Sequence, residues 1–167
     1  MSFKPFALAP LAVLTFALPA LAQPTPTMVR QFGDWNLYSY QNGGSKSCYV
    51  LTVPKQALPA SVSHGDNYFL VAPKPSGNGY YPQAIMGYDL QAGSQMTASV
   101  GDESFVMVPK GNSGWTQQEG DDAALIRAMR GGAQLTLKAV SGRGTQTSYT
   151  FSLTGVSAAL ESAAACR

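Results

Sequence analysis

Side chains that could carry out acid–base or metal chemistry are few in this sequence. His64 is its single histidine, and it lies in a segment rich in Pro, Ser and Gly. General acid–base catalysis and metal binding both need partner groups at a defined geometry, which one histidine does not supply. We therefore interpret His64 as a solvated loop residue. We expect no metal site and no cofactor.

Three carboxylates lie close together in sequence, at Glu119, Asp121 and Asp122. Two of them could form the carboxylate pair of a glycoside hydrolase. Capping a helix accounts for the two aspartates more economically, because a carboxylate accepts the unpaired N–H groups at a helix N-terminus. We predict no catalytic residue, and an envelope hydrolase with a dispersed site stays open as the alternative.

Candidate binding residues come from aromatic and cationic side chains next to glycines. Arg143 lies between Gly142 and Gly144, where its guanidinium could bind an anionic sugar or a phosphate. The alternative is a hairpin turn that simply needs glycine. Trp115 follows Gly114 and belongs either to a binding surface or to the core.

Tyr80 and Tyr81 follow the Gly77-Asn78-Gly79 segment, which we interpret as a flexible loop. Aromatic side chains on such a loop suit contacts with carbohydrate, peptide or protein, although one of the two could pack inward. The predicted binding surface therefore comprises Tyr80, Tyr81, Trp115 and Arg143.

The N-terminal segment has the pattern of a cleaved signal peptide over residues 1–22. Lys4 precedes an apolar run over 6–18, and Ala20-Leu21-Ala22 gives the small-x-small pattern of a cleavage site. The run is short for a membrane span, so we expect no transmembrane segment in the mature chain. Residues 23–31 then form a flexible leader, and 32–167 form a single domain.

Charge excludes several kinds of partner. The chain has 11 Lys and Arg against 9 Asp and Glu, and this balance leaves no basic stripe. Nucleic acid is therefore not an expected partner, and a polybasic membrane patch is equally absent. An unknown envelope component or host-surface molecule is the partner we expect.

Cys48 and Cys166 are the only two cysteines, and both belong to the mature chain. In an exported protein an even pair is a candidate disulfide. A disulfide between them would close a long loop of the chain, and it would contribute roughly 2–4 kcal/mol to stability. The alternative is two free buried thiols, and the absence of a C-x-x-C motif argues against a catalytic dithiol.

Alternating apolar and polar residues predict strands, most clearly over 134–139 and 148–153. Further strands are expected over 35–40, 47–53, 68–72, 85–90, 96–100 and 104–108. Helices are expected over 123–130, capped by Asp121 or Asp122, and over 156–163. The pattern predicts a mainly β fold, a sandwich of about seven or more short strands with two short helices in the C-terminal third. The expected core comprises Trp35, Leu37, Val50, Leu135, Leu137, Tyr149, Phe151, Leu153 and Leu160.

Several segments carry a resemblance to a known family. They are Phe32-Gly33-Asp34-Trp35, Lys46-Ser47-Cys48-Tyr49, Ile85-Met86-Gly87-Tyr88 and the whole of 121–166. The most specific are Ala128-Met129-Arg130-Gly131-Gly132-Ala133 and Ser141-Gly142-Arg143-Gly144-Thr145. With these segments the chain resembles the invasion-associated locus B family of exported bacterial proteins, over residues 32–166.

The resemblance implies an immunoglobulin-like β-sandwich, a cell-envelope location and, in some members, a link to host-cell invasion. It implies no known reaction. We therefore expect a periplasmic or secreted, non-enzymatic protein that acts as a binding or interaction module. The alternatives are the envelope hydrolase and a structural stabiliser of an envelope assembly, which would present a large flat apolar surface.

Overall fold

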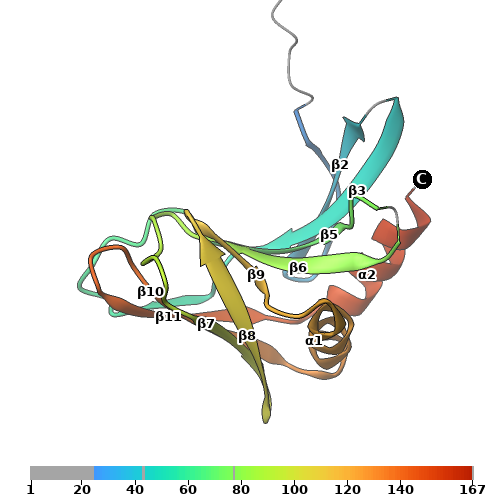
Figure 1. Cartoon of the computed structure of the whole chain (residues 1–167). Coiled ribbons are helices and arrows are strands. Elements are labelled where there is room, and N and C mark those ends of the chain that lie inside the picture. The colour runs from blue at the N-terminus through green and yellow to red at the C-terminus, as the bar shows by residue number, and fades with distance from the viewer. Residues whose placement is uncertain (1–24, 43, 77, 167) are drawn as a thin grey trace, which may run out of the picture.

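A single antiparallel sheet runs through the chain (Figure 1). The computed structural model describes residues 25–42, 44–76 and 78–166, and within them the sheet has eleven strands. Their order across the sheet is β1-β2-β3-β5-β6-β9-β8-β7-β10-β11-β4. The strands are β1 (Thr27–Phe32), β2 (Trp35–Asn42), β3 (Ser45–Thr52), β4 (Gln56–Leu58), β5 (Tyr68–Pro73), β6 (Tyr80–Ile85), β7 (Met96–Val100), β8 (Glu103–Lys110), β9 (Ser113–Thr116), β10 (Gln134–Val140) and β11 (Gln146–Ser152). The helices are α1 (Glu119–Gly131) and α2 (Val156–Ala165). This mainly β fold agrees with the prediction.

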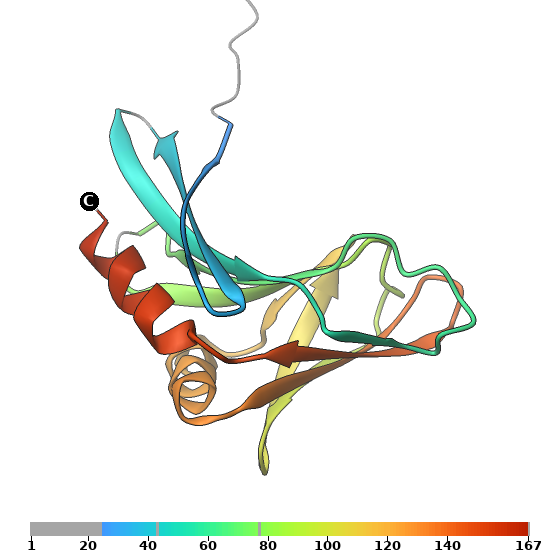
Figure 2. The same cartoon turned by 180° about the vertical axis from the view of Figure 1, so that it is seen from behind.

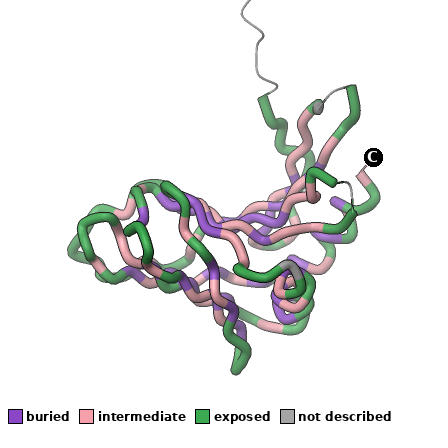
Figure 3. The backbone as a smooth tube through the Cα atoms, viewed as in Figure 1, coloured by how far each residue is buried: buried purple, intermediate pink, exposed green. Residues whose placement is uncertain are grey.

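The sheet bends so that its two halves pack face to face, as in a sandwich (Figure 2). Phe69 of β5 lies against Phe151 of β11, with ring centroids 5.7 Å apart. Trp35 Nε1 of β2 donates a hydrogen bond to the carbonyl oxygen of Ser152, at 3.0 Å. All nine predicted core residues are buried. Buried and partly exposed residues alternate along the strands (Figure 3), as one-sided burial requires.

The two helices close one end of this core. α2 buries Val156, Ala159, Leu160 and Ala163, and it packs on β2 and β3. The residue that follows α2, Cys166, forms a disulfide with Cys48 of β3, and their Cα atoms are 6.0 Å apart. The disulfide therefore ties the C-terminal helix to the sheet. No helix in the described residues is both long and apolar enough to cross a membrane.

The N-terminal boundary differs from the expectation. Residues 27–32, most of which we assigned to a flexible leader, form strand β1, which pairs with β2. Strand β1 is an edge strand held by backbone hydrogen bonds, and its side chains are almost all exposed. Such a strand has no buried face, so it lacks the alternation that reveals strands in a sequence. The predicted signal peptide, residues 1–22, lies outside the described residues.

The strand predicted over 85–90 is also wrong. Strand β6 instead ends at Ile85, and the backbone of Gly87 then packs directly on that of Gly65. A Cβ atom on Gly87 would lie 2.5 Å from the backbone nitrogen of Asp66. The contact requires glycine at this position, and it draws two loops together at one end of the sheet.

Candidate functional site

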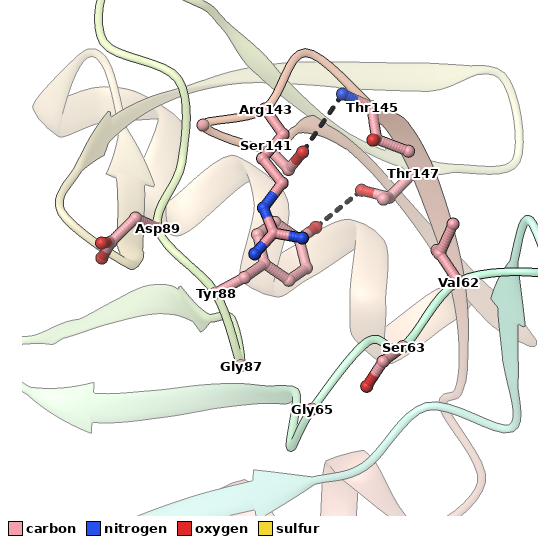
Figure 4. Close-up of a pocket in the computed structure, with 11 residues that line it drawn as sticks. Val62, Ser63, Gly65, Gly87, Tyr88, Asp89, Ser141, Arg143, Thr145 and Thr147 are labelled. Carbon is pink, nitrogen blue, oxygen red and sulfur yellow. Dashed lines mark hydrogen bonds between the residues drawn. The ribbon is translucent and has the colours of Figure 1, made fainter.

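A pocket of about 650 Å³ lies among the loops at one end of the sheet (Figure 4). Three chain segments line it: 62–65 between β4 and β5, 87–89 between β6 and β7, and the β10–β11 turn at 141–145. Thr147 of β11 completes the wall. We call this cavity the loop-end pocket.

The first two walls of the loop-end pocket are joined by Asn67, a buried residue just before β5. Its side-chain nitrogen donates hydrogen bonds to the carbonyl oxygens of His64 and Gly65, at 3.1 and 3.0 Å. Its side-chain oxygen accepts one from the N–H of Gly87, at 3.1 Å. One amide therefore satisfies backbone groups of both loops and fixes their separation.

The third wall is a tight turn that carries Arg143. The N–H of Ser141 donates to the carbonyl oxygen of Thr145, and the N–H of Thr145 donates to Ser141 Oγ, at 2.9 and 3.1 Å. The N–H of Gly142 donates to the carbonyl oxygen of Asp89, at 2.7 Å, which ties the turn to the second wall. Hydrogen bonds thus hold the turn that carries Arg143 and join this turn to the 87–89 segment.

Arg143 is the predicted binding residue that the fold places in this pocket. Its side chain extends from the turn into the cavity, on the side of Tyr88, whereas the Asp89 carboxylate points away from it (Figure 4). Within the described residues Arg143 forms no ion pair. An unpaired guanidinium in a concave site is a fork of donors that matches a carboxylate or a phosphate.

A chain of hydrogen bonds runs behind the pocket and includes His64. The two ring nitrogens of His64 lie 2.7 Å from the Tyr149 hydroxyl and 3.0 Å from the carbonyl oxygen of Pro59. The Tyr149 hydroxyl donates to that of Tyr88, at 3.0 Å, and Tyr88 in turn bonds Thr147 at 2.6 Å. Burial, followed by the hydrogen bond to Tyr88, raises the pKa of Tyr149 well above its usual range. His64 therefore lies in a loop, as predicted, but it is half-buried and hydrogen-bonded through both ring nitrogens instead of solvated.

The other predicted binding residues do not join Arg143. Strand β6 begins at Tyr80, so Tyr80 and Tyr81 lie on a strand instead of a loop, and their side chains point to opposite faces. Tyr80 packs against the core and lines a second pocket of about 390 Å³ beside α1 and α2. Tyr81 pairs with Ala72 on the outer face of the sheet, and Trp115 of β9 lies on that same face.

Neither Asp121 nor Asp122 caps α1, so the capping role predicted for them is wrong. The N-cap residue is Gln118, without a capping hydrogen bond from a side chain. Asp122 is buried instead within the first turns of the helix, where it accepts a hydrogen bond from Thr116 and pairs with Lys74 at 2.9 Å. Its carboxylate therefore fixes α1 to the strands. Within the described residues no three His, Cys, Asp or Glu side chains gather into a metal site.

Sequence reasoning missed Tyr88, Tyr149 and Thr147 as members of the loop-end pocket and its supporting chain. These residues come from segments about 60 positions apart, and no local spacing links them. Tyr38 and Tyr40 alternate with the core residues Trp35 and Leu37 and face away from the core, as that alternation indicates, but they were not assigned to a binding surface. The sequence does indicate such a surface, because aromatic residues at both odd and even positions of one strand indicate that both of its faces are apolar.

Comparisons with known proteins place the chain in a family. The family model described as "Invasion associated locus B (IalB) protein" matches residues 35–164. The chain belongs to the invasion-associated locus B family. In fold it is similar to the crystal structure of invasion associated protein B from Bartonella henselae, with a TM-score of 0.61 and 15% identity over 83% of this chain and 96% of that one. No curated protein matches this chain.

Proposed function

We propose that this member of the invasion-associated locus B family is an exported, non-enzymatic binding protein. Its loop-end pocket takes a polar ligand that carries a carboxylate or a phosphate group. The observation that supports this most is Arg143, an unpaired cation that extends into a pocket of about 650 Å³. Arg143 is exposed to solvent within this pocket, and a cleft lined by one sign of charge raises the local concentration of ions of opposite charge.

The composition of the pocket wall supports a ligand that also carries hydroxyl groups. Ser63, Thr145, Thr147 and Tyr88 line the same cavity as Arg143. The hydroxyls of Ser63 and Thr145 can both donate and accept, so they suit the hydroxyl groups of a saccharide around its acidic group, whereas those of Tyr88 and Thr147 already bond one another. An acidic saccharide of the cell envelope or of a host surface fits this chemistry.

A binding role is favoured over the hydrolase alternative by the environment of His64. Both of its ring nitrogens are within hydrogen-bonding distance of protein groups, Tyr149 and Pro59, and His64 does not line the pocket. A general base must instead reach the proton that it removes. Export is supported by the signal-peptide pattern of residues 1–22 and by the disulfide, since such bonds persist in oxidising compartments.

Isothermal titration with acidic saccharides and with their neutral counterparts tests the proposal. The protein should bind one or more acidic forms, and Arg143→Gln should weaken that affinity by at least about tenfold, or ~1.4 kcal/mol. Lys138→Gln is the matched control, because Lys138 is an exposed cation of β10 outside the loop-end pocket. Equal affinity of Arg143→Gln and the wild type would contradict the site. Cleavage of the bound saccharide would contradict the non-enzymatic role.

A further inference from the structure

The outer face of the strands from β2 to β8 has an unusual composition. Residues that pair directly across neighbouring strands share a face, so the register defines each row. One row runs Asn36, Leu51, Leu70, Gln83, Trp115 and Val108, across six strands. An open antiparallel sheet normally turns polar side chains outward, and this row is mainly apolar.

A second row beside it is mainly aromatic. Met28 of β1 pairs with Tyr38 of β2, and Tyr38 pairs with Tyr49 of β3. The pairing of Val50 with Val71 then places Tyr49 opposite Ala72, which pairs with Tyr81. Tyr40 lies two residues beyond Tyr38 and therefore on the same face. We call the surface made by Tyr38, Tyr40, Tyr49, Leu51, Tyr81 and Trp115 the tyrosine face.

This surface is accessible. All six of its residues are partly exposed, and Met28 and Val108 at its two margins are 48% and 46% exposed. Both helices pack on the opposite side of these strands (Figures 1 and 2). Contiguous apolar patches on a sheet are typical of contact surfaces.

The tyrosine rings are packed against one another. Tyr38 and Tyr49 stack at a centroid distance of 5.4 Å and an angle of 13°, and Tyr40 meets Tyr49 edge-on at 6.0 Å. Burial, and then the neighbouring Tyr40, raise the pKa of Tyr81. Rings that stack across two strands turn their faces toward each other. They leave edges and hydroxyls for a partner, a geometry that suits an interdigitating protein surface better than a flat sugar ring.

The lack of charge on this face favours a second copy of the chain as its partner. Within the two rows, as the described strands define them, there is no Asp, Glu, Lys or Arg, and Lys110 opposite Ser113 lies at the margin. The centres of protein interfaces are likewise depleted of charge and enriched in Tyr, Trp and Met. A two-fold contact places a patch against itself, and an uncharged patch meets no like-charge repulsion there.

We propose that the tyrosine face is the interface through which two copies of this protein associate. The contact is isologous: the aromatic row of one copy packs on that of the other. It is separate from the loop-end pocket, and it needs no ligand. A contact between two copies of the protein is thus compatible with ligand binding at the loop-end pocket.

Sedimentation analysis of the purified protein tests this. The wild type should sediment as a concentration-dependent dimer. Tyr81→Arg and Trp115→Arg should each raise the dimer dissociation constant at least about tenfold, because each places two like charges in one apolar contact. Leu58→Arg is the matched control, since Leu58 is 44% exposed on β4, away from the tyrosine face.

Near-ultraviolet circular dichroism identifies a variant that fails to fold. The dimer dissociation constant of the other arginine variant then tests the proposal. A wild type that remains a monomer at its highest soluble concentration would overturn the proposal. So would a dimer that the folded arginine variants leave intact, because that dimer would use another surface. Neither result would bear on ligand binding by Arg143.

Discussion

The two ends of this molecule are secured by different kinds of interaction. At the helix end, α2 packs an apolar stripe on the sheet, and the Cys48–Cys166 disulfide fixes its last turn. At the loop end, the walls of the pocket are joined by directional polar contacts, from Asn67 to Gly87 and from His64 to Tyr149. Helix α2 is held by covalent and apolar forces, and the walls of the loop-end pocket are held by hydrogen bonds.

The difference matters for what each end can do. Apolar packing and a cross-link stabilise a helix without defining polar groups in space. Hydrogen bonds hold donors and acceptors in fixed directions, as recognition of a polar ligand requires. Loops that are held in this way bury less apolar surface than a packed helix does. Such regions open more easily than a packed core. The loop end is therefore the part of the molecule suited to recognition.

The largest effect is expected at the core that supports both ends. Phe151→Ala removes the ring that packs against Phe69 between the two halves of the sheet. It should lower the free energy of unfolding by about 3–5 kcal/mol through lost burial and a cavity. Urea unfolding measures this, with Thr150→Ala as the control on the outer side of the same strand. A loss below about 1 kcal/mol would show that the halves do not share a core.

The next effect is expected at the helix end alone. Cys166→Ser should lower stability by roughly 2–4 kcal/mol, because the unfolded chain regains the freedom that the cross-link removes. Hydrogen exchange should quicken in α2 and stay unchanged in the pocket loops. Adding reductant to the wild type should reproduce the loss, and the variant should not respond to reductant. Two freely alkylated thiols in the unreduced protein would refute the pairing.

The sequence predicted the parts of the fold that have one buried face. Strands β10 and β11 alternate cleanly because Leu137 and Phe151 point into the core while their neighbours face solvent. The edge strands β1 and β4 escaped notice because most of their side chains are exposed. The tyrosine pair was misplaced because the flexible loop predicted at Gly77-Asn78-Gly79 was taken to extend to Tyr80 and Tyr81. Tyr80 and Tyr81 in fact begin a hairpin strand, and Gly77 itself lies outside the described residues.

Only part of the candidate site could be predicted from the sequence, for a different physical reason. Arg143 could be singled out because flanking glycines mark a turn that exposes a side chain. The cavity that gives Arg143 a role is built from three loops, and their approach depends on the backbone contact of Gly65 with Gly87. The tyrosine face likewise depends on strand register, which a single strand does not reveal.

The smallest of these effects, and the one most specific to the loop end, should follow Tyr149→Phe. The ring stays in the core, but the hydroxyl between His64 and Tyr88 is lost. Stability should fall by about 1–2 kcal/mol, because His64 and Tyr88 each lose a partner. Hydrogen exchange should quicken over residues 60–66 and not in α2, the reverse of Cys166→Ser. Tyr68→Phe is the control, since the Tyr68 hydroxyl makes no hydrogen bond within the described residues. Unchanged exchange over 60–66 would mean that backbone contacts alone hold the pocket wall.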